Sequence, residues 1–75
     1  MDNLREINVI ETGQNIRRLM DENGYTTKIL QDIFGFTTRS AFYKWFDGLS
    51  LPTVDHLVIL AQLFGCTVDD IIVLC

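Results

Sequence analysis

Residues 26–47, TTKILQDIFGFTTRSAFYKWFD, decide the fold of this chain. On either side of Gly35 the apolar residues recur three and four positions apart, which is the spacing of amphipathic helices. Gly35 is typical of the position just after a helix, because glycine adopts the left-handed conformation without strain. Thr37 or Thr38 can cap the next helix through its hydroxyl. The segment predicts two short helices, about 26–34 and 38–47, joined by a tight turn.

The same punctuation by glycine and threonine continues toward both ends of the chain. Three further glycines each end an apolar-periodic stretch and are followed by a threonine: Gly24, Gly48 and Gly65. Thr12 is the expected cap of the first helix, and Thr67 with Asp70 has the spacing of a capping box. Five short helices are therefore predicted, at about 13–23, 26–34, 38–47, 53–64 and 67–73.

Length and composition allow one small domain. The chain has 75 residues, of which 48% are hydrophobic and 21% charged, which is ordinary for a globular protein. The expected fold is all-α, a compact bundle of five short helices. We expect an N-terminal arm at 1–12 and the helical domain at 13–75. Within the arm, residues 4–11 are compatible with an extended segment packed on the bundle or with one irregular helical turn.

The sequence argues against several classes of protein. No apolar run approaches the roughly 18 residues of a membrane span, and residues 1–6 do not resemble a signal peptide. We therefore expect a cytoplasmic protein without membrane contact. Cys66, Cys75 and His56 lack metal-ligand spacing, so reduced thiols, an exposed helical histidine and no metal or other cofactor are expected. Neither enzyme activity nor a small-molecule substrate is expected from so small a bundle without a catalytic motif.

Charge is unevenly distributed along the chain. The net charge is −4, and all six basic residues lie at or before position 44. Any basic patch must therefore lie in the middle of the chain. Arg17 and Arg18 stand four residues before Asp21 and Glu22. Phosphate contacts are one interpretation of these arginines, but pairing on a solvated helix face is the favoured one.

The helices predicted at 26–34 and 38–47 outline a helix-turn-helix, and the second has the two faces that a DNA-reading helix needs. Phe42, Trp45 and Phe46 supply an apolar face that docks on the bundle. The opposite face carries hydrogen-bond donors: Arg39, Ser40, Tyr43 and Lys44. Arg39 can offer a bidentate fork to guanine O6 and N7 in the major groove.

Residues 13–72 resemble the lambda-repressor/Cro-like helix-turn-helix proteins of bacteria and phages. The resemblance rests, in order, on GQNIRRLMDENGYTT, LQDIFGF, TTRSAFYKWFDG, LPTVDHLVILAQLFG and CTVDDII. The pattern YKWxxGxxLPTVDxL is similar to small stand-alone regulators of the xenobiotic-response-element type, common in Gram-positive bacteria.

The resemblance implies roles for individual residues in binding double-stranded DNA. It implies that Thr27 holds a phosphate, that Arg39 and Ser40 read bases, and that Tyr43 and Lys44 contact bases or backbone. We add Thr38 and Lys28, near the starts of the two helices, as candidate phosphate contacts. A merely solvated Lys28 is an equally good interpretation.

Three departures from the family pattern stand out. Phe36 is an extra residue in the turn, which changes the expected docking angle of the recognition helix. Gln31 replaces a small residue near the turn. Met20 and Phe46 occupy positions where many members have a partly buried Arg–Glu pair. Because an apolar pair often replaces a buried ion pair without loss of stability, we expect Met20 and Phe46 to pack together.

The expected function is a transcriptional repressor that binds a short inverted repeat as a homodimer. Apolar residues in excess of what the core needs are expected to form the two-fold interface: Ile59, Leu63, Ile72 and Leu74. The alternative is a protein-interaction module, antitoxin-like or antirepressor-like, that keeps the fold and binds DNA weakly. The net charge of −4 favours this alternative. DNA binding stays ahead because charges well over about 10 Å from the DNA are largely screened.

Overall fold

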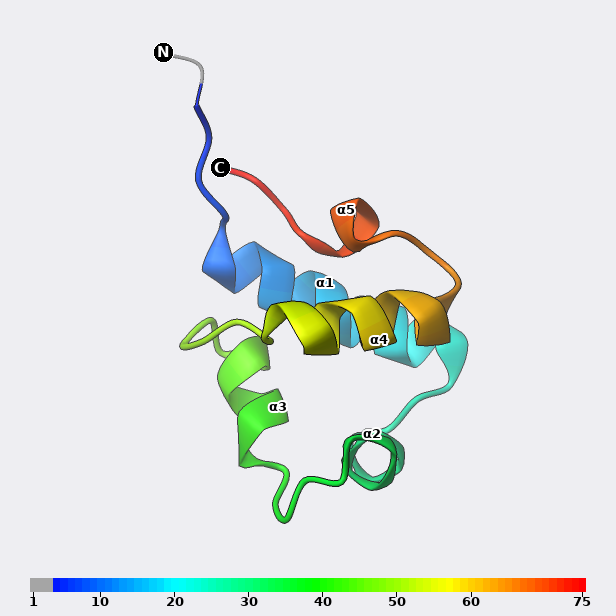
Figure 1. Ribbon diagram of the computed structural model, residues 1–75. Helices are drawn as coiled ribbons and strands as arrows, with labels where there is room; N and C mark the ends of the chain where they lie inside the picture. The colour runs from blue at the N-terminus through cyan, green and yellow to red at the C-terminus, as the bar shows by residue number, and fades with distance from the viewer. Residues whose placement is uncertain (1–3) are drawn as a thin grey trace.

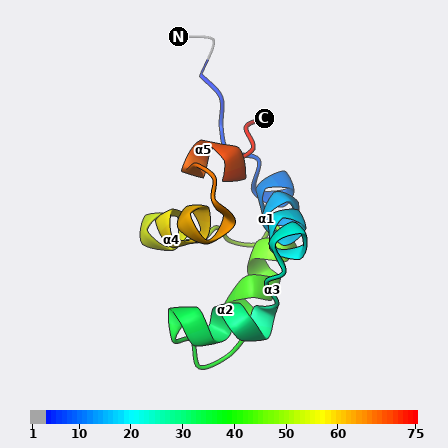
Figure 2. The same ribbon diagram turned by 90° about the vertical axis from the view of Figure 1, so that its right-hand side faces the viewer.

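The computed structural model describes residues 4–75, which form a bundle of five helices (Figure 1). They are α1 (Val9–Asn23), α2 (Thr27–Phe34), α3 (Ser40–Phe46), α4 (Val54–Phe64) and α5 (Val68–Ile71). In both views α1 and α4 lie at mid-height, with α5 above them and the α2–α3 pair below (Figure 2). The predicted all-α fold is confirmed.

Most helix ends follow the predicted cap chemistry. Gly24, Gly35 and Gly65 adopt left-handed conformations directly after α1, α2 and α4. Thr26 and Thr53 accept the N–H groups of the residues three positions on, at the starts of α2 and α4. The capping box between Thr67 and Asp70 is present at the start of α5.

The first helix begins at Val9, four residues earlier than predicted, and Thr12 does not cap it. Asn8 is the cap, and its Oδ1 accepts the N–H of Glu11 at 3.0 Å. Thr12 is instead fully buried inside the helix, because its hydroxyl pairs with Val73 near the other end of the chain. The extended part of the predicted arm is thus shorter than 1–12, and its residues 1–3 lie outside the described part of the chain.

The last helix is shorter than the predicted 67–73, because the chain after Ile71 turns into an extended tail. The tail lies antiparallel to the residues before α1 through a single bridge between Ile7 and Leu74. The N–H of Asn8 donates to the Val73 carbonyl oxygen, and that of Cys75 donates to Glu6, each at 2.8 Å. Both ends of the described chain are therefore held against each other, on the side away from α2 and α3 (Figure 1).

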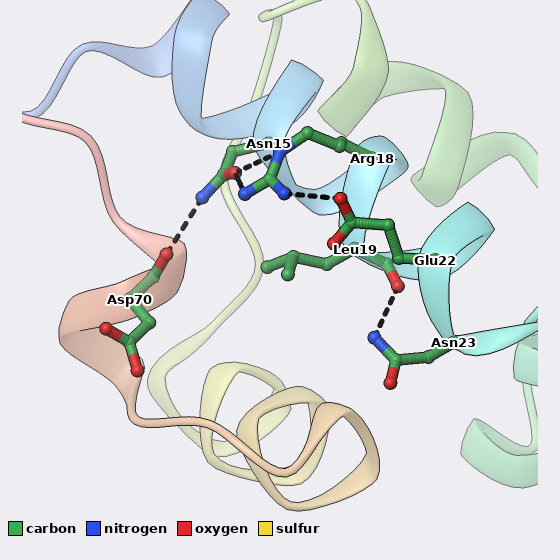
Figure 3. Close-up of polar contacts among 6 residues, drawn as sticks. All are labelled: Asn15, Arg18, Leu19, Glu22, Asn23 and Asp70. Carbon is green, nitrogen blue, oxygen red and sulfur yellow. Dashed lines mark hydrogen bonds and ion pairs between the residues drawn. The ribbon is translucent and has the colours of Figure 1, made fainter.

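Asn15 closes the carbonyl end of α5. Its Nδ2 donates to the main-chain oxygens of Asp70 and Ile71, each at 2.9 Å. Figure 3 shows Asn15 between Asp70 and Arg18, whose guanidinium donates to the Asn15 Oδ1. In the same view the Asn23 side chain donates back to the Leu19 carbonyl one turn earlier. Helix carbonyls that lack an intrahelical partner need such donors, so Asn15 fixes the short α5 against α1.

Side chains from all five helices form the hydrophobic core. Its buried apolar side chains are Ile16, Met20, Leu30, Phe42, Trp45, Leu57, Leu60, Ala61, Phe64 and Ile71. Gly13 lets α1 and α3 approach closely, because a Cβ at this position would overlap the carbonyl oxygen of Trp45. The recognition helix is therefore seated directly on α1.

Residues 4–75 contain no candidate membrane-spanning helix and no candidate metal site. None of these helices combines the length and apolar character needed to cross a membrane. Over the same residues, no three side chains of His, Cys, Asp or Glu gather as a metal site would require.

Candidate nucleic-acid interface

The inner face of α3 is anchored by aromatic packing. Phe42 and Trp45 are buried, and their rings meet edge to face with centroids 5.0 Å apart. Phe34 of α2 stacks on Phe42 at 6.0 Å, which joins the two helices of the helix-turn-helix. The predicted docking face of the recognition helix is confirmed for Phe42 and Trp45, and Phe46 is half-buried beside them.

Phe36, in the turn between α2 and α3, folds inward and packs on the core. Its ring lies 5.4 Å from the rings of Phe34 and Phe42 and 5.1 Å from the imidazole of His56. His56 is therefore half-buried, and the prediction of an exposed histidine is wrong. The first turn of α4 lies against this aromatic cluster, and an imidazole there fills space that solvent would otherwise occupy.

The recognition helix starts two residues later than predicted. The helix begins at Ser40 rather than near residue 38, and neither Thr37 nor Thr38 stands at the cap position. The Thr38 hydroxyl nevertheless accepts the N–H of Ser40, the first residue of α3, at 3.4 Å. Arg39 stands at the cap position without a side-chain hydrogen bond to the helix. Residues 37–39 between Phe36 and α3 are exposed, and α3 starts later than the apolar spacing indicates.

The four predicted base-reading residues share the outer surface of α3. Arg39, Ser40 and Lys44 are exposed, and the side chain of Tyr43 is 52% exposed. The Nε of Arg39 donates to the Oε1 of Gln31 on α2 at 3.2 Å. Within residues 4–75 the terminal amino groups of Arg39 have no hydrogen-bond acceptor, so its bidentate fork is available. Gln31 thus orients Arg39.

The predicted phosphate contacts lie around the same surface. Thr38 and Lys28 are exposed and Thr27 is half-buried. The hydroxyl oxygens of Thr38 and Ser40 lie 2.9 Å apart, within hydrogen-bond distance. Lys28, Arg39 and Lys44 are the basic residues of the α2–α3 unit, and Asp32 on α2 and Asp47 after α3 are its carboxylates. The surface of the unit is therefore only weakly basic.

A shallow groove of about 260 Å³ separates the end of α1 from the α2–α3 pair. It is lined by Arg17, Met20, Asp21, Tyr25, Thr26, Thr27, Tyr43 and Phe46. Met20 is buried and Phe46 half-buried, and both border the groove. The replacement of an ion pair by these two apolar side chains stays a prediction, since it concerns energies rather than positions.

The two neighbouring arginines of α1 behave differently. Arg18 pairs with Glu22 at 2.7 Å, as predicted. Arg17 forms no ion pair with Asp21 in the described chain; its guanidinium carbon lies 5.3 Å from the centroid of the Phe46 ring. The predicted pairing of Arg17 with Asp21 is therefore wrong. Adjacent residues of a helix point about 100° apart around its axis. Arg17 therefore points toward Phe46 of α3, and Arg18 points elsewhere.

The side chains predicted to form the dimer interface are only partly exposed to solvent. Ile59 is half-buried, and Leu63 and Ile72 are half-buried side chains packed against the core. Leu74 is 43% exposed in the extended tail. Other large apolar side chains have a similar or larger exposed fraction: Leu4, Ile10, Ile29, Ile33, Leu49, Val54 and Val58.

Two ionisable groups at α5 are perturbed. Hydrogen bonds from the main chain and side chain of Thr67 hold the pKa of the Asp70 carboxyl below its usual range. Burial, with a smaller contribution from the charge of Asp70, raises the pKa of the Cys66 thiol. Both groups lie near α5, away from the helix-turn-helix (Figure 1).

Residues 15–74 match the family described as the Cro/C1-type HTH DNA-binding domain. The chain belongs to this family. The match begins inside α1 and includes all of α2 to α5, so it takes in the complete helix-turn-helix. The chain matches no curated protein and no solved structure in the parallel comparisons. The protein is thus a DNA-binding regulator of the Cro/C1 type.

Proposed function

We propose that this Cro/C1-type protein is a sequence-specific transcriptional repressor that binds a short inverted repeat as a homodimer. One observation carries the proposal. The residues Arg39, Ser40, Tyr43 and Lys44 share the free surface of α3. The opposite surface of this helix is anchored by Phe42 and Trp45. A donor-rich helix face on a rigid support is what reading of the major groove requires.

Arg39 is the base-reading residue that the geometry favours most. Gln31 holds its Nε, while the terminal amino groups remain free to donate to O6 and N7 of guanine. Thr38 and Ser40 stand beside it, with their hydroxyls able to reach phosphate or base. Thr27 and Lys28 contact the backbone from the start of α2. Lys44 and Tyr43 contact bases or backbone one turn along α3.

A homodimer is proposed because two recognition helices about 34 Å apart would read successive major grooves. Its two-fold interface is built on Ile59, Leu63, Ile72 and Leu74. The partially exposed apolar surfaces of α4 and the tail support this choice. The pattern YKWxxGxxLPTVDxL supports a place among the small stand-alone regulators. Such a protein works in the cytoplasm with DNA and its second copy, without cofactor, membrane or small-molecule substrate.

The alternative is a protein-interaction module with weak DNA binding. Two observations favour it. The net charge is −4, and α2 exposes Ile29 and Ile33 one turn apart, at 42% and 46%. An apolar stripe beside the DNA-facing surface suits a protein partner better than a phosphate backbone.

Selection of binding sites from random duplexes by the purified protein, repeated at several salt concentrations, separates the two functions. The repressor proposal expects enrichment of an inverted repeat whose half-sites are one helical turn apart. A pool that shows no enrichment even at low salt favours the interaction module. Binding that is strong at low salt and unselective in sequence also contradicts the proposal.

A further inference from the structure

We propose that Arg17 is an additional DNA-contacting residue, whose guanidinium neutralises a phosphate of the duplex at the groove between α1, α2 and α3. This inference rests on the DNA binding by α3 proposed above and extends the interface onto α1. It reverses the interpretation of Arg17 as the ion-pair partner of Asp21.

The arginines that precede α2 within residues 4–75 differ in what they contact. Arg5 donates to the carbonyl oxygens of Cys75, at 2.7 Å, and Leu74. Arg18 is held by Glu22 and by the amide oxygen of Asn15. Arg17 has neither an ion pair nor a hydrogen-bond acceptor within the described chain. Its charge is therefore the one on α1 that remains free for a ligand.

The position of Arg17 agrees with the candidate interface. It lines the same groove as Thr27 and Tyr43, both of which are proposed to contact DNA. The Phe46 ring beneath its guanidinium belongs to the recognition helix, and the Tyr43 ring meets Phe46 edge to face at 6.0 Å. Arg17, Phe46 and Tyr43 thus form a continuous surface from α1 onto α3.

The Phe46 ring also holds the Arg17 guanidinium where its N–H groups can bind an anion. A guanidinium above a ring face is attracted by the π-electrons, while its N–H donors lie in its own plane and stay free for oxygen acceptors. Because Phe46 is half-buried, its ring has limited freedom and restricts the arginine. Asp21 lines the groove as well, and its carboxylate opposes an anion there. Arg17 is the basic residue among the groove-lining side chains, so the phosphate contact depends on it.

The chain offers a matched control for this inference in the neighbouring Arg18. Arg17→Gln and Arg18→Gln remove the same charge from adjacent positions of the same helix. Affinity for the selected duplex and for a scrambled duplex is measured by fluorescence anisotropy over a series of salt concentrations. We expect Arg17→Gln to reduce the magnitude of the log–log salt slope by about 0.9 per subunit and to weaken both duplexes alike. Arg18→Gln leaves the slope unchanged, and Arg17→Lys preserves it.

Equal salt slopes for Arg17→Gln and Arg18→Gln overturn the inference and leave the proposed function intact. Failure of the wild-type protein to bind any duplex overturns both. Thermal unfolding of each variant checks that the fold is kept. Should Arg17→Gln unfold, Arg17→Lys is compared with the wild type on duplexes that carry single neutral methylphosphonate linkages. A wild-type protein that is insensitive to every neutralised linkage beside α1 then contradicts the phosphate contact.

Discussion

Thr12 and Val73 are joined by two hydrogen bonds although 61 residues separate them in the chain. The Thr12 hydroxyl accepts the N–H of Val73 at 3.0 Å and donates to the Val73 carbonyl oxygen at 3.4 Å. Thr12 is fully buried, so these bonds are made away from water. They tie the extended tail to the first turns of α1, and thereby hold α5 in place.

Thr12→Val keeps the shape of the side chain and removes the hydroxyl. The N–H of Val73 loses its acceptor, and we expect the free energy of unfolding to fall by about 1–3 kcal/mol. Urea unfolding measures this change, and Thr37→Val, at an exposed position, is the control. A Thr12→Val protein as stable as the control would show that the tail contributes nothing through this pair.

Phe36→Ala removes the ring that anchors the turn. Because Phe36 is half-buried, we expect a loss of about 2 kcal/mol, less than the full cost for a core phenylalanine. The recognition helix loses support at its start, so DNA affinity should fall for all sequences together. Thermal unfolding and anisotropy titration measure the two effects. Leu49→Ala, on an exposed leucine, is the matched truncation, and equal stability of the two variants would refute the anchoring role.

Helix boundaries were predictable wherever cap chemistry is local. The left-handed glycines at 24, 35 and 65 and the threonine caps at 26, 53 and 67 act within a few residues of themselves. The exposed face of α3 likewise follows from helical spacing alone, which is why Arg39 and Tyr43 could be assigned to the surface.

The remaining features depend on contacts between distant parts of the chain. Threonine is a residue type that often caps helices, but Asn8 caps α1 in place of Thr12. The hydrogen-bond partner of Thr12 is Val73, which comes close only in the complete fold. An aromatic side chain such as Phe36 favours burial, but the spacing of its neighbours in the sequence does not show which residues it packs against. Arg17 has an acidic residue four positions on, and only the packing of α3 against α1 shows that Phe46 is its neighbour instead.

Asp70 makes stability depend on pH. Its pKa in the folded protein is below the ordinary value of 3.8, so its contribution is present above that value and is lost as the pH falls through the folded pKa. We expect Asp70→Asn to be less stable than the wild type at neutral pH, with the difference shrinking below about pH 4. Urea midpoints across this range test it, with Asp69→Asn as the control. A difference that stays constant with pH would contradict the role of the Thr67 hydrogen bonds.

Leu74→Asp tests the proposed two-fold interface with little risk to the fold, because Leu74 is half exposed whereas Leu63 and Ile72 pack on the core. We expect light scattering to show a dimer for the reduced wild-type protein and a monomer for Leu74→Asp. Val54→Asp, on the more exposed side of α4, should remain dimeric. A wild-type monomer at high micromolar concentration would rule out the homodimer.

The central claim is that the outer surface of α3 reads DNA sequence through Arg39. The most direct measurement is the affinity of the wild type and of Arg39→Ala for the selected duplex and its single-base-pair variants. We expect the wild type to prefer one base pair per half-site by about 1–3 kcal/mol, and Arg39→Ala to bind all four base pairs there equally. Lys44→Ala, the control, should weaken every duplex by a similar factor. An Arg39→Ala protein with the base preferences of the wild type would contradict the account.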